Sequence, residues 1–258
     1  MIKMKNVVHI CVVSHKHAKL ILELNCLADL SKMENVRVYI KCNSKDEHAK
    51  ELSLYCNNNN IFMYDDNYGM GFGENNNYIF NKILTDEKYN DDDFFLCLNP
   101  DVFIKPNVLS SLVILCRRNN IKMSTINLYK NFEKSIVDGN VRVYPSFYSF
   151  TKSLLGFGND CIIDKSSLSD EAYVDWAAGS FLLFDFSTYS KLSGFDERYF
   201  MYCEDVDICY RANKQLGIKV KYFNTLEAIH IAQHDNRRLF SKAMFNHIHS
   251  AFKFLMSK

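Results

Sequence analysis

Hydrophobic residues in this chain form short continuous runs separated by amphipathic segments. Continuous apolar runs predict buried strands of a parallel sheet, and they cover residues 7–13, 36–40, 61–64, 94–98 and 181–184. Between the runs, apolar residues recur at helical spacing, which predicts helices over 19–30, 46–56, 75–84 and 107–117. This alternation is typical of an open sheet. The sequence therefore predicts an α/β fold with a Rossmann-like, mostly parallel central sheet flanked by helices.

Two regions leave alternatives open. Residues 121–173 show no clear period, but Asp138-Gly139 and Tyr144-Pro145 are typical of turns, so we expect a hairpin or meander between them. The tail over 237–258 is basic and has apolar residues at helical spacing. Its helix either lies on an anionic membrane surface or packs on the sheet.

Polar residues follow the predicted strands. Ser14-His15 follows the first strand, Asn43 the second and Asn67 the third. Ligands of open α/β sheets bind outside the carboxyl ends of the strands. The fourth strand ends in Asn99-Pro100-Asp101, where the proline ring restricts the backbone and Asp101 offers the oxygen ligand that a divalent cation prefers. These residues predict a ligand-binding edge of the sheet.

A glycine-rich loop follows the third strand, with Gly69, Gly71 and Gly73 at alternate positions. Such density marks backbone that turns sharply or lies close to a ligand, although the dinucleotide spacing G-x-G-x-x-G fails at Glu74. The helix after the loop begins with asparagines, Asn76 among them, and its N-terminus suits a phosphate or a sugar hydroxyl. An ordinary glycine turn with capping asparagines is the alternative.

Three carboxylates gather inside the apolar and aromatic segment 199–211, namely Glu204, Asp205 and Asp207. Burying a carboxylate costs several kcal/mol unless it is paired or bound to a cation. Helical spacing places the first two at a helix N-terminus, where the dipole favours negative charge, and pairs Asp207 with Arg211 at i,i+4. The segment is either a functional carboxylate site or only an acidic helix cap.

Composition narrows the function classes. The chain has 258 residues and a net charge of +1, which argues against nucleic acid as a partner. Nine cysteines without a C-x-x-C pair indicate reduced thiols in a cytoplasm. The first apolar run ends early at His15, with no cleavage site after it, so it predicts a strand and not a signal peptide. No run of about 18 apolar residues is present to span a membrane.

The single tryptophan, Trp176, stands beside small residues that include Gly179. An exposed aromatic ring in such a setting can stack on a sugar. A core tryptophan is the commoner case and remains the alternative.

In chain order, four motifs stand together: N-x-G-x-G-x-G, the strand with N-P-D, V-D-W-x-A-G-S, and E-D-x-D-x-x-x-R. This series resembles the inverting glycosyltransferases of family 2, which have the GT-A fold, over about residues 7–250. It is most similar to bacterial rhamnosyltransferases that use dTDP-rhamnose to build O-antigen or other surface polysaccharides. The resemblance implies one domain over 1–258, with a nucleotide-sugar-binding half to about 105, an acceptor and catalytic half over 106–235, and a basic helix over 236–258.

The resemblance also implies roles for single residues. Mg²⁺ or Mn²⁺ and the donor diphosphate are expected at Asp101 with His230, and the catalytic base corresponds to Asp205 with Glu204 beside it. We assign donor contacts to Ser14, His15, Asn43, Asn67, Gly71, Gly73, Asn76, Asn99 and Asp101. We assign acceptor contacts to Trp176 and Gly179.

The residues support this chemistry independently. Sugar transfer needs a cation for the leaving diphosphate, a carboxylate for the acceptor's proton and a polar shell that orients the sugar. One base and no visible nucleophile indicate a single displacement with inversion. We expect a cytoplasmic enzyme, peripheral on the inner face of the membrane, that moves L-rhamnose from dTDP-rhamnose to a polyprenyl-diphosphate-linked sugar such as GlcNAc.

One departure keeps other functions open. Many members of the family have Asp-Asn after the second strand, where the Asp contacts the nucleobase, whereas this chain has Cys42-Asn43. A UDP-sugar-dependent transferase and a non-catalytic nucleotide-sugar-binding protein are therefore alternatives. A nucleotidyltransferase fits less well, because residues 67–77 contain no Lys or Arg for a triphosphate.

Overall fold

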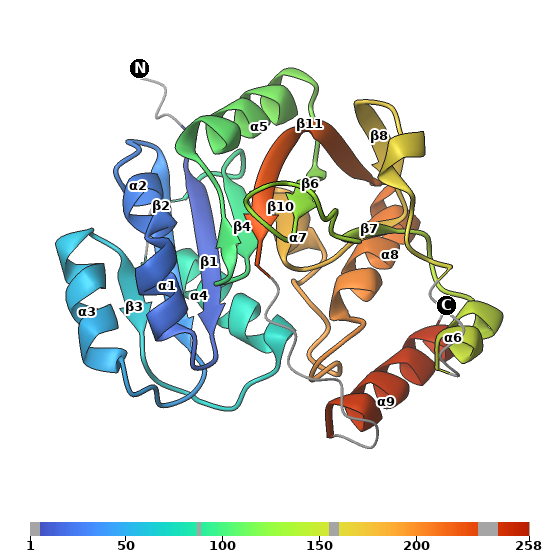
Figure 1. The fold of residues 1–258 in the computed structure, drawn as a ribbon, viewed down its shortest axis with the longest axis horizontal. Helices are drawn as coiled ribbons and strands as arrows, with labels where there is room; N and C mark the ends of the chain where they lie inside the picture. The colour runs from blue at the N-terminus through green and yellow to red at the C-terminus, as the bar shows by residue number, and fades with distance from the viewer. Residues whose placement is uncertain (1–5, 87–88, 155–159, 232–241, 258) are drawn as a thin grey trace.

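A computed structural model describes residues 6–86, 89–154, 160–231 and 242–257. Among these residues a nine-stranded sheet has the order β3-β2-β1-β4-β10-β6-β11-β5, and β8 pairs with β11 (Figure 1). The strands are β1 Val8–Ser14, β2 Val36–Cys42, β3 Phe62–Tyr64, β4 Phe94–Leu98, β5 Val102–Phe103, β6 Met123–Tyr129, β8 Glu171–Val174, β10 Phe181–Asp185 and β11 Val220–His230. A second, two-stranded sheet pairs β7 (Val141–Arg142) with β9 (Trp176–Ala177).

Helices cover both faces of the large sheet (Figure 1). Helices α1, α2, α3 and α5 share one hydrophobic cluster with the sheet, and α4, α7, α8 and α9 share the other. Their bounds are α1 Ala18–Leu24, α2 Cys26–Ser31, α3 Ala49–Asn58, α4 Phe72–Asp86, α5 Pro106–Arg118, α6 Phe147–Leu154, α7 Phe186–Lys191, α8 Glu204–Leu216 and α9 Lys242–Ser257. The 3₁₀ turn Lys165–Ser167 precedes β8.

The predicted α/β architecture is confirmed. Strands β3, β2, β1 and β4 are parallel neighbours, and β6 is parallel to β11. Strand β10 runs antiparallel between β4 and β6. The described residues of both proposed halves thus share one sheet, so a division near residue 105 remains a prediction. None of the described helices has both the length and the apolarity that crossing a bilayer requires.

Local structure departs from a simple interpretation of the sequence at three places. The single helix expected over 19–30 is two helices, because Asn25 takes a left-handed φ of 50° between α1 and α2. Within 121–173, where a hairpin or meander was expected, the described residues form the antiparallel bridges Tyr129–Val137 and Arg142–Ile162. Strand β7 also pairs with the distant β9, and β6 is a core strand. Asp93 is buried against His9, although it is the last of three consecutive acidic residues before β4.

Candidate active site

The acidic pair Glu204 and Asp205 opens helix α8. The two residues before it, Tyr202 and Cys203, have left-handed φ values of 69° and 67°. Such backbone costs about 1 kcal/mol or more per non-glycine residue. It turns the chain abruptly into the helix, so that both carboxylates stand in its first turn, where the dipole favours them.

The two carboxylates have different surroundings. Asp205 is partly exposed; its Oδ2 accepts from the Gly179 N–H at 3.2 Å and its Oδ1 from the Val206 N–H at 2.9 Å. Glu204 is 6% exposed, and its Oε2 has no hydrogen-bond partner among the described residues. Of the pair, only Asp205 is placed to meet a substrate.

The same surroundings shift both pKa values upward. Burial and the neighbouring charge of Asp205 raise the pKa of Glu204 to about 8. Burial also raises the pKa of Asp205, against the charge of Arg142 and the N–H groups of Gly179 and Val206, which lower it. Glu204 is therefore mostly neutral at pH 7.

Replacing Glu204 by Gln should make stability less dependent on pH. The folded protein keeps a proton on Glu204 that the unfolded chain releases above about pH 4.5. The free energy of unfolding therefore falls as the pH rises from about 4.5 to 8. Gln has no proton to lose, so Glu204→Gln should gain stability over wild type on the order of 1–3 kcal/mol at pH 8.5, and less at pH 5.5.

Urea unfolding at both pH values measures this difference. The matched control is Asp91→Asn, which removes an exposed carboxylate at the amino end of β4. An equal difference between Glu204→Gln and wild type at pH 5.5 and 8.5 would contradict the assignment of the buried proton.

The third carboxylate, Asp207, has a structural role. As predicted, it pairs with Arg211: Nε lies 2.7 Å from its Oδ2. The Arg211 Nη groups donate to the carbonyls of Leu192 and Gly194 at 2.7 and 2.9 Å. This ion pair anchors the loop after α7 to α8.

The candidate metal ligands meet where β11 pairs with β5. His230 lies opposite Val102 in this pair, which places its Nε2 3.3 Å from Oδ1 of Asp101. On the other side, Nδ1 of His230 lies 2.6 Å from Oδ2 of Asp138. Burial lowers the pKa of His230, but the neighbouring carboxylates of Asp101 and Asp138 outweigh it and raise the pKa to about 9.

These residues fit a divalent cation that has further ligands from a substrate. Oδ1 of Asp101 is buried without a hydrogen bond among the described residues, and a carboxylate behind a metal-binding imidazole is a common arrangement. No group of three His, Cys, Asp or Glu in the described part of the chain could hold a metal alone. Diphosphate oxygens and water would have to complete the shell. From the sequence, Asp138 was expected only in a turn, and its contact with His230 was not predicted.

One short segment connects the acidic pair with the candidate metal ligands. The Gly179 N–H holds Asp205, and the next carbonyl, that of Ser180, accepts from the Asn99 N–H at 2.9 Å. Asn99 begins the N-P-D turn that carries Asp101. The candidate base and the candidate cation ligand thus lie on either side of a single peptide segment, at the carboxyl end of β4.

The glycine loop packs against protein. A Cβ at Gly71 would lie 2.5 Å from the Phe200 carbonyl oxygen, and one at Gly73 would lie 2.6 Å from Cβ of Phe195. The Phe72 N–H also donates to the Phe200 carbonyl at 3.1 Å. Gly71 and Gly73 therefore let the segment before Glu204 lie directly on α4, and their contact with a donor stays a prediction.

The asparagines after the loop also face inward, inside α4. Asn76 is 1% exposed, and its amide donates to the Phe72 carbonyl at 2.9 Å, while its contact with a donor stays a prediction. Asn77, which the sequence did not single out, accepts from the Tyr189 hydroxyl and the Phe195 N–H, at 2.8 and 2.9 Å. Its amide also donates to the Phe195 carbonyl at 2.9 Å, which fixes the loop that leads to Glu204.

The remaining donor candidates lie at the ends of β1, β2 and β3. The Asn43 side chain is bound to both the N–H and the carbonyl of Met70, at 2.9 and 2.8 Å. The Ser14 carbonyl accepts from the Asn43 N–H at 2.7 Å. His15 and Asn67 are exposed. These residues hold the carboxyl edge of the parallel strands together, and their contact with a donor remains a prediction.

The lysine beside Cys42 also stabilises this edge. Nζ of Lys41 is buried and donates to the carbonyls of Cys42 and Asn67, at 2.8 and 3.3 Å. The Cys42 thiol is buried, and burial raises its pKa to about 12. A neutral, buried Cys42 thiol therefore cannot replace the nucleobase contact of the Asp that many members of the resembled family have at this position.

Trp176 is a core residue. It is 7% exposed, its indole N–H donates to the Val143 carbonyl at 2.9 Å, and the Arg142 guanidinium lies over its ring. Of the two alternatives that the sequence left open, the core tryptophan is confirmed, and the contact of Trp176 with an acceptor stays a prediction. The predicted acceptor residue Gly179 is placed beside Asp205, as described above.

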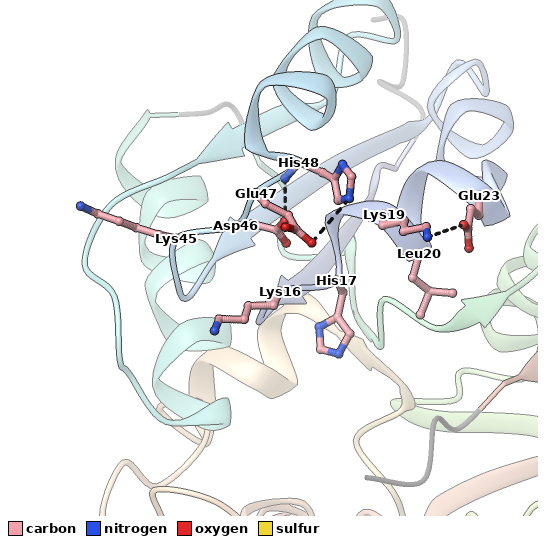
Figure 2. A pocket seen from close by; sticks show the side chains of 9 residues that line it. All are labelled: Lys16, His17, Lys19, Leu20, Glu23, Lys45, Asp46, Glu47 and His48. Atoms are coloured by element: carbon pink, nitrogen blue, oxygen red, sulfur yellow. Dashed lines mark hydrogen bonds and ion pairs between the residues drawn. The ribbon is translucent and has the colours of Figure 1, made fainter.

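A separate pocket of about 500 Å³ opens between the loop after β1, helix α1 and residues 45–48 before α3 (Figure 2). Its lining mixes lysines, histidines and acidic residues, and Lys19 and Glu23 form an ion pair across 3.8 Å. None of the candidate catalytic, donor or metal residues lines it. It is therefore distinct from the site built around Asp205.

Comparison with solved structures gives the same fold. The mannosyltransferase PcManGT from Pyrobaculum calidifontis, in complex with GDP-Man and Mn²⁺, has a TM-score of 0.64 at 10% identity and covers 99% of this chain and 66% of its own. GalNAc-T7 with UDP, GalNAc and Mn²⁺ has a TM-score of 0.61 at 13% identity, over 88% of this chain and 44% of its own. At such identities the likeness shows the fold alone.

Sequence comparison is more specific. No model of a known protein family matches the chain. The rhamnosyltransferase WbbL of Escherichia coli K12 is 35% identical over 253 residues, which are 97% of this chain and 93% of WbbL. The N-acetylglucosaminyl-diphospho-decaprenol L-rhamnosyltransferase of Mycobacterium tuberculosis H37Rv is 38% identical over 88 residues, 34% of this chain and 28% of that protein.

Proposed function

We propose a function from one premise: this chain belongs to the rhamnosyltransferase family represented by WbbL, and is a glycosyltransferase. The proposed reaction moves L-rhamnose from dTDP-rhamnose to the sugar of a polyprenyl-diphosphate-linked acceptor such as GlcNAc, with inversion. The name of the mycobacterial relative supports the choice of acceptor.

In the proposed reaction, Asp205 removes the proton from the acceptor hydroxyl as that oxygen attacks the anomeric carbon. The bond from this carbon to the diphosphate breaks, and dTDP leaves with the bonding electrons. Asp101 and His230 would hold Mg²⁺ or Mn²⁺, which neutralises charge on the leaving diphosphate when bound. Glu204 is buried and neutral, so it places no second negative charge beside Asp205.

The observation that carries this proposal is the Gly179–Ser180 segment between the two groups. It binds Asp205 through one N–H and the N-P-D turn through the next carbonyl. A base and a diphosphate-binding cation must lie on either side of the anomeric carbon for direct displacement. This segment supports that arrangement in a single site.

A donor panel tests the proposal. The protein is incubated with Mn²⁺, a GlcNAc-diphosphate-lipid acceptor and dTDP-rhamnose, UDP-GlcNAc, UDP-glucose or UDP-galactose, and the product is analysed by mass spectrometry and NMR. We expect transfer from dTDP-rhamnose with an inverted anomeric centre. Transfer from a UDP-sugar alone would establish the alternative donor. The sequence leaves this alternative open because Cys42 stands where many members of the resembled family have Asp. Donor binding without transfer or hydrolysis would establish a non-catalytic binding protein.

Membrane attachment through the C-terminal helix is also a proposal. The predicted helix over 236–258 is α9 where the structure describes it, while 236–241 and 258 lie outside the described residues. One face of α9 packs on the protein through Ala251, Phe254 and Leu255, as the packing alternative predicted. The other face exposes Phe252 and Met256, which are 59% and 67% exposed. We propose that this outer face enters the membrane interface of a cytoplasmic, peripheral enzyme.

Substituting the outer face should therefore reduce liposome binding without unfolding the protein. Truncation before α9 is unsuitable, because it removes the buried Phe254. The variant Phe252→Ser/Met256→Ser should lose at least about tenfold in binding to anionic vesicles, since each side chain contributes about 1.5–3 kcal/mol when fully buried. Leu54→Ser/Ile114→Ser removes two equally exposed residues elsewhere as the control. Equal co-sedimentation of both variants and wild type would contradict the proposal.

A further inference from the structure

Arg142 is a cation that the motifs do not account for. It lies opposite Trp176 in the β7–β9 pair, with its guanidinium over the indole ring, 5.0 Å from the centroid. Its Nε donates to the Gly139 carbonyl at 2.8 Å. Among the described residues, its two Nη nitrogens form neither a hydrogen bond nor an ion pair. Arg142 is only partly buried, so a pre-oriented pair of donors is available to an anion.

The position of Arg142 relates it to the candidate base. Its charge lowers the pKa of Asp205, so the two groups lie within electrostatic reach of each other. The strand beneath it, β9, continues directly to Gly179, whose N–H holds Asp205. An anion bound by Arg142 would therefore lie close to a sugar whose hydroxyl meets Asp205.

The chain beyond Arg142 is apolar and exposed. Val143 follows it, and Phe147 and Tyr148 begin helix α6; all three are among the exposed large hydrophobic residues. Tyr144, between them, packs edge-on against Tyr210 of α8, and Phe254 of α9 packs on the same Tyr210. Apolar surface thus leads from Arg142 towards the helix proposed to meet the membrane.

These three features follow the order of groups in one class of acceptor. A sugar at Asp205, a diphosphate at Arg142 and a lipid over residues 143–148 would match a sugar-diphosphate-lipid from end to end. The donor diphosphate has its own partners at Asp101 and His230. We propose that Arg142 binds the diphosphate of the lipid-linked acceptor and selects it over a neutral glycoside. The inference rests on the proposed function and adds to it the residue that recognises the acceptor.

The test compares two acceptors that differ only in the diphosphate: GlcNAc-diphosphate-alkyl and the neutral alkyl β-GlcNAc of equal chain length. Wild type should favour the first in kcat/KM. Charge-assisted hydrogen bonds contribute about 1.5–3 kcal/mol, so Arg142→Ala should lower this preference about 10–100-fold. The ratio of the two kcat/KM values is unaffected by any change in Asp205 that the substitution causes, because such a change alters the rates with both acceptors equally. Arg142→Lys keeps the positive charge but loses the paired N–H donors of the guanidinium group. It should therefore retain part of the preference.

Arg117→Ala is the matched control. Its guanidinium also lies over an aromatic ring, that of Phe94 at 5.7 Å, but at the amino end of β4. It should keep the wild-type ratio. An equal loss for both acceptors in Arg142→Ala, or a raised KM for the donor with the ratio unchanged, would overturn the inference.

A binding measurement separates this inference from the proposed reaction. Calorimetric titration with GlcNAc-diphosphate-alkyl, without donor, should show about 10–100-fold weaker binding to Arg142→Ala than to wild type. This result stands even if wild type transfers no rhamnose, in which case only the proposed reaction fails. Unchanged affinity in Arg142→Ala would overturn the role of Arg142 whatever the reaction is.

Discussion

Replacing Asp205 by Asn will lower turnover by about 10²–10⁴-fold, the range that general-base catalysis supplies. Asn has the same shape and keeps an oxygen that can accept from the Gly179 N–H, which Asp205 binds at 3.2 Å. It cannot accept the proton of the acceptor hydroxyl. Donor affinity should stay within about twofold of wild type, because the site proposed for the diphosphate is at Asp101 and His230. Initial rates at saturating donor and acceptor, with calorimetry for dTDP, measure both quantities.

Glu204→Gln is the comparison for this variant. It alters the neighbouring carboxyl group but leaves Asp205 in place, so its loss of turnover should be much smaller. If Glu204→Gln is inactive and Asp205→Asn turns over normally, the roles of the two residues are reversed. If both variants are fully active, the acidic pair is only a helix cap.

Replacing Asp101 by Ala will abolish the dependence of donor binding on Mn²⁺. Asp101 is the only carboxylate of the N-P-D turn, and its Oδ1 is buried without a hydrogen bond among the described residues. Loss of a supporting residue around a metal typically costs about 10–100-fold in affinity, and loss of a ligand should cost at least that much. Titration of dTDP with Mn²⁺ and with EDTA measures the difference directly.

Two controls make this result specific. Asp91→Asn removes an exposed carboxylate at the opposite end of β4 and should keep the wild-type response to Mn²⁺. A thermal melt without metal should show Asp101→Ala folded, since among the described residues its carboxylate pairs only with His230, across 3.3 Å. Equal dTDP affinity with and without Mn²⁺ in wild type, or an unchanged Mn²⁺ effect in Asp101→Ala, would refute the metal assignment.

Some parts of the site were readable because short-range patterns determine them. The run before Asn99 is apolar at every position from Phe94 to Leu98, which is a buried strand in any parallel sheet, and β4 has those bounds. Glu204 and Asp205 precede an apolar helical pattern, and α8 begins at Glu204. In both cases the residues within one turn or one strand supply the whole signal.

Other roles depend on contacts across the chain. The sequence placed Gly71 and Asn76 at a ligand because glycines and asparagines suit both loops and binding sites. Only the fold brings Phe200 against Gly71 and turns the Asn76 amide into α4. Asp138 is likewise 92 residues from His230, and no local pattern marks a carboxylate whose partner is so distant.

By itself, the sequence determined the alternating α/β architecture, the strand ends that carry Asp101 and the helix start that carries Asp205, because hydrophobic period and capping act over a few residues. The tertiary structure decided which of these polar groups are buried or paired and which are accessible to a substrate. It buried Glu204 and left Asp205 accessible, covered Trp176 with Arg142, and set Asp138 behind His230. Burial and pairing depend on surfaces that meet only in the folded chain, so hydrophobic spacing and capping alone do not distinguish the partly exposed Asp205 from the buried Glu204.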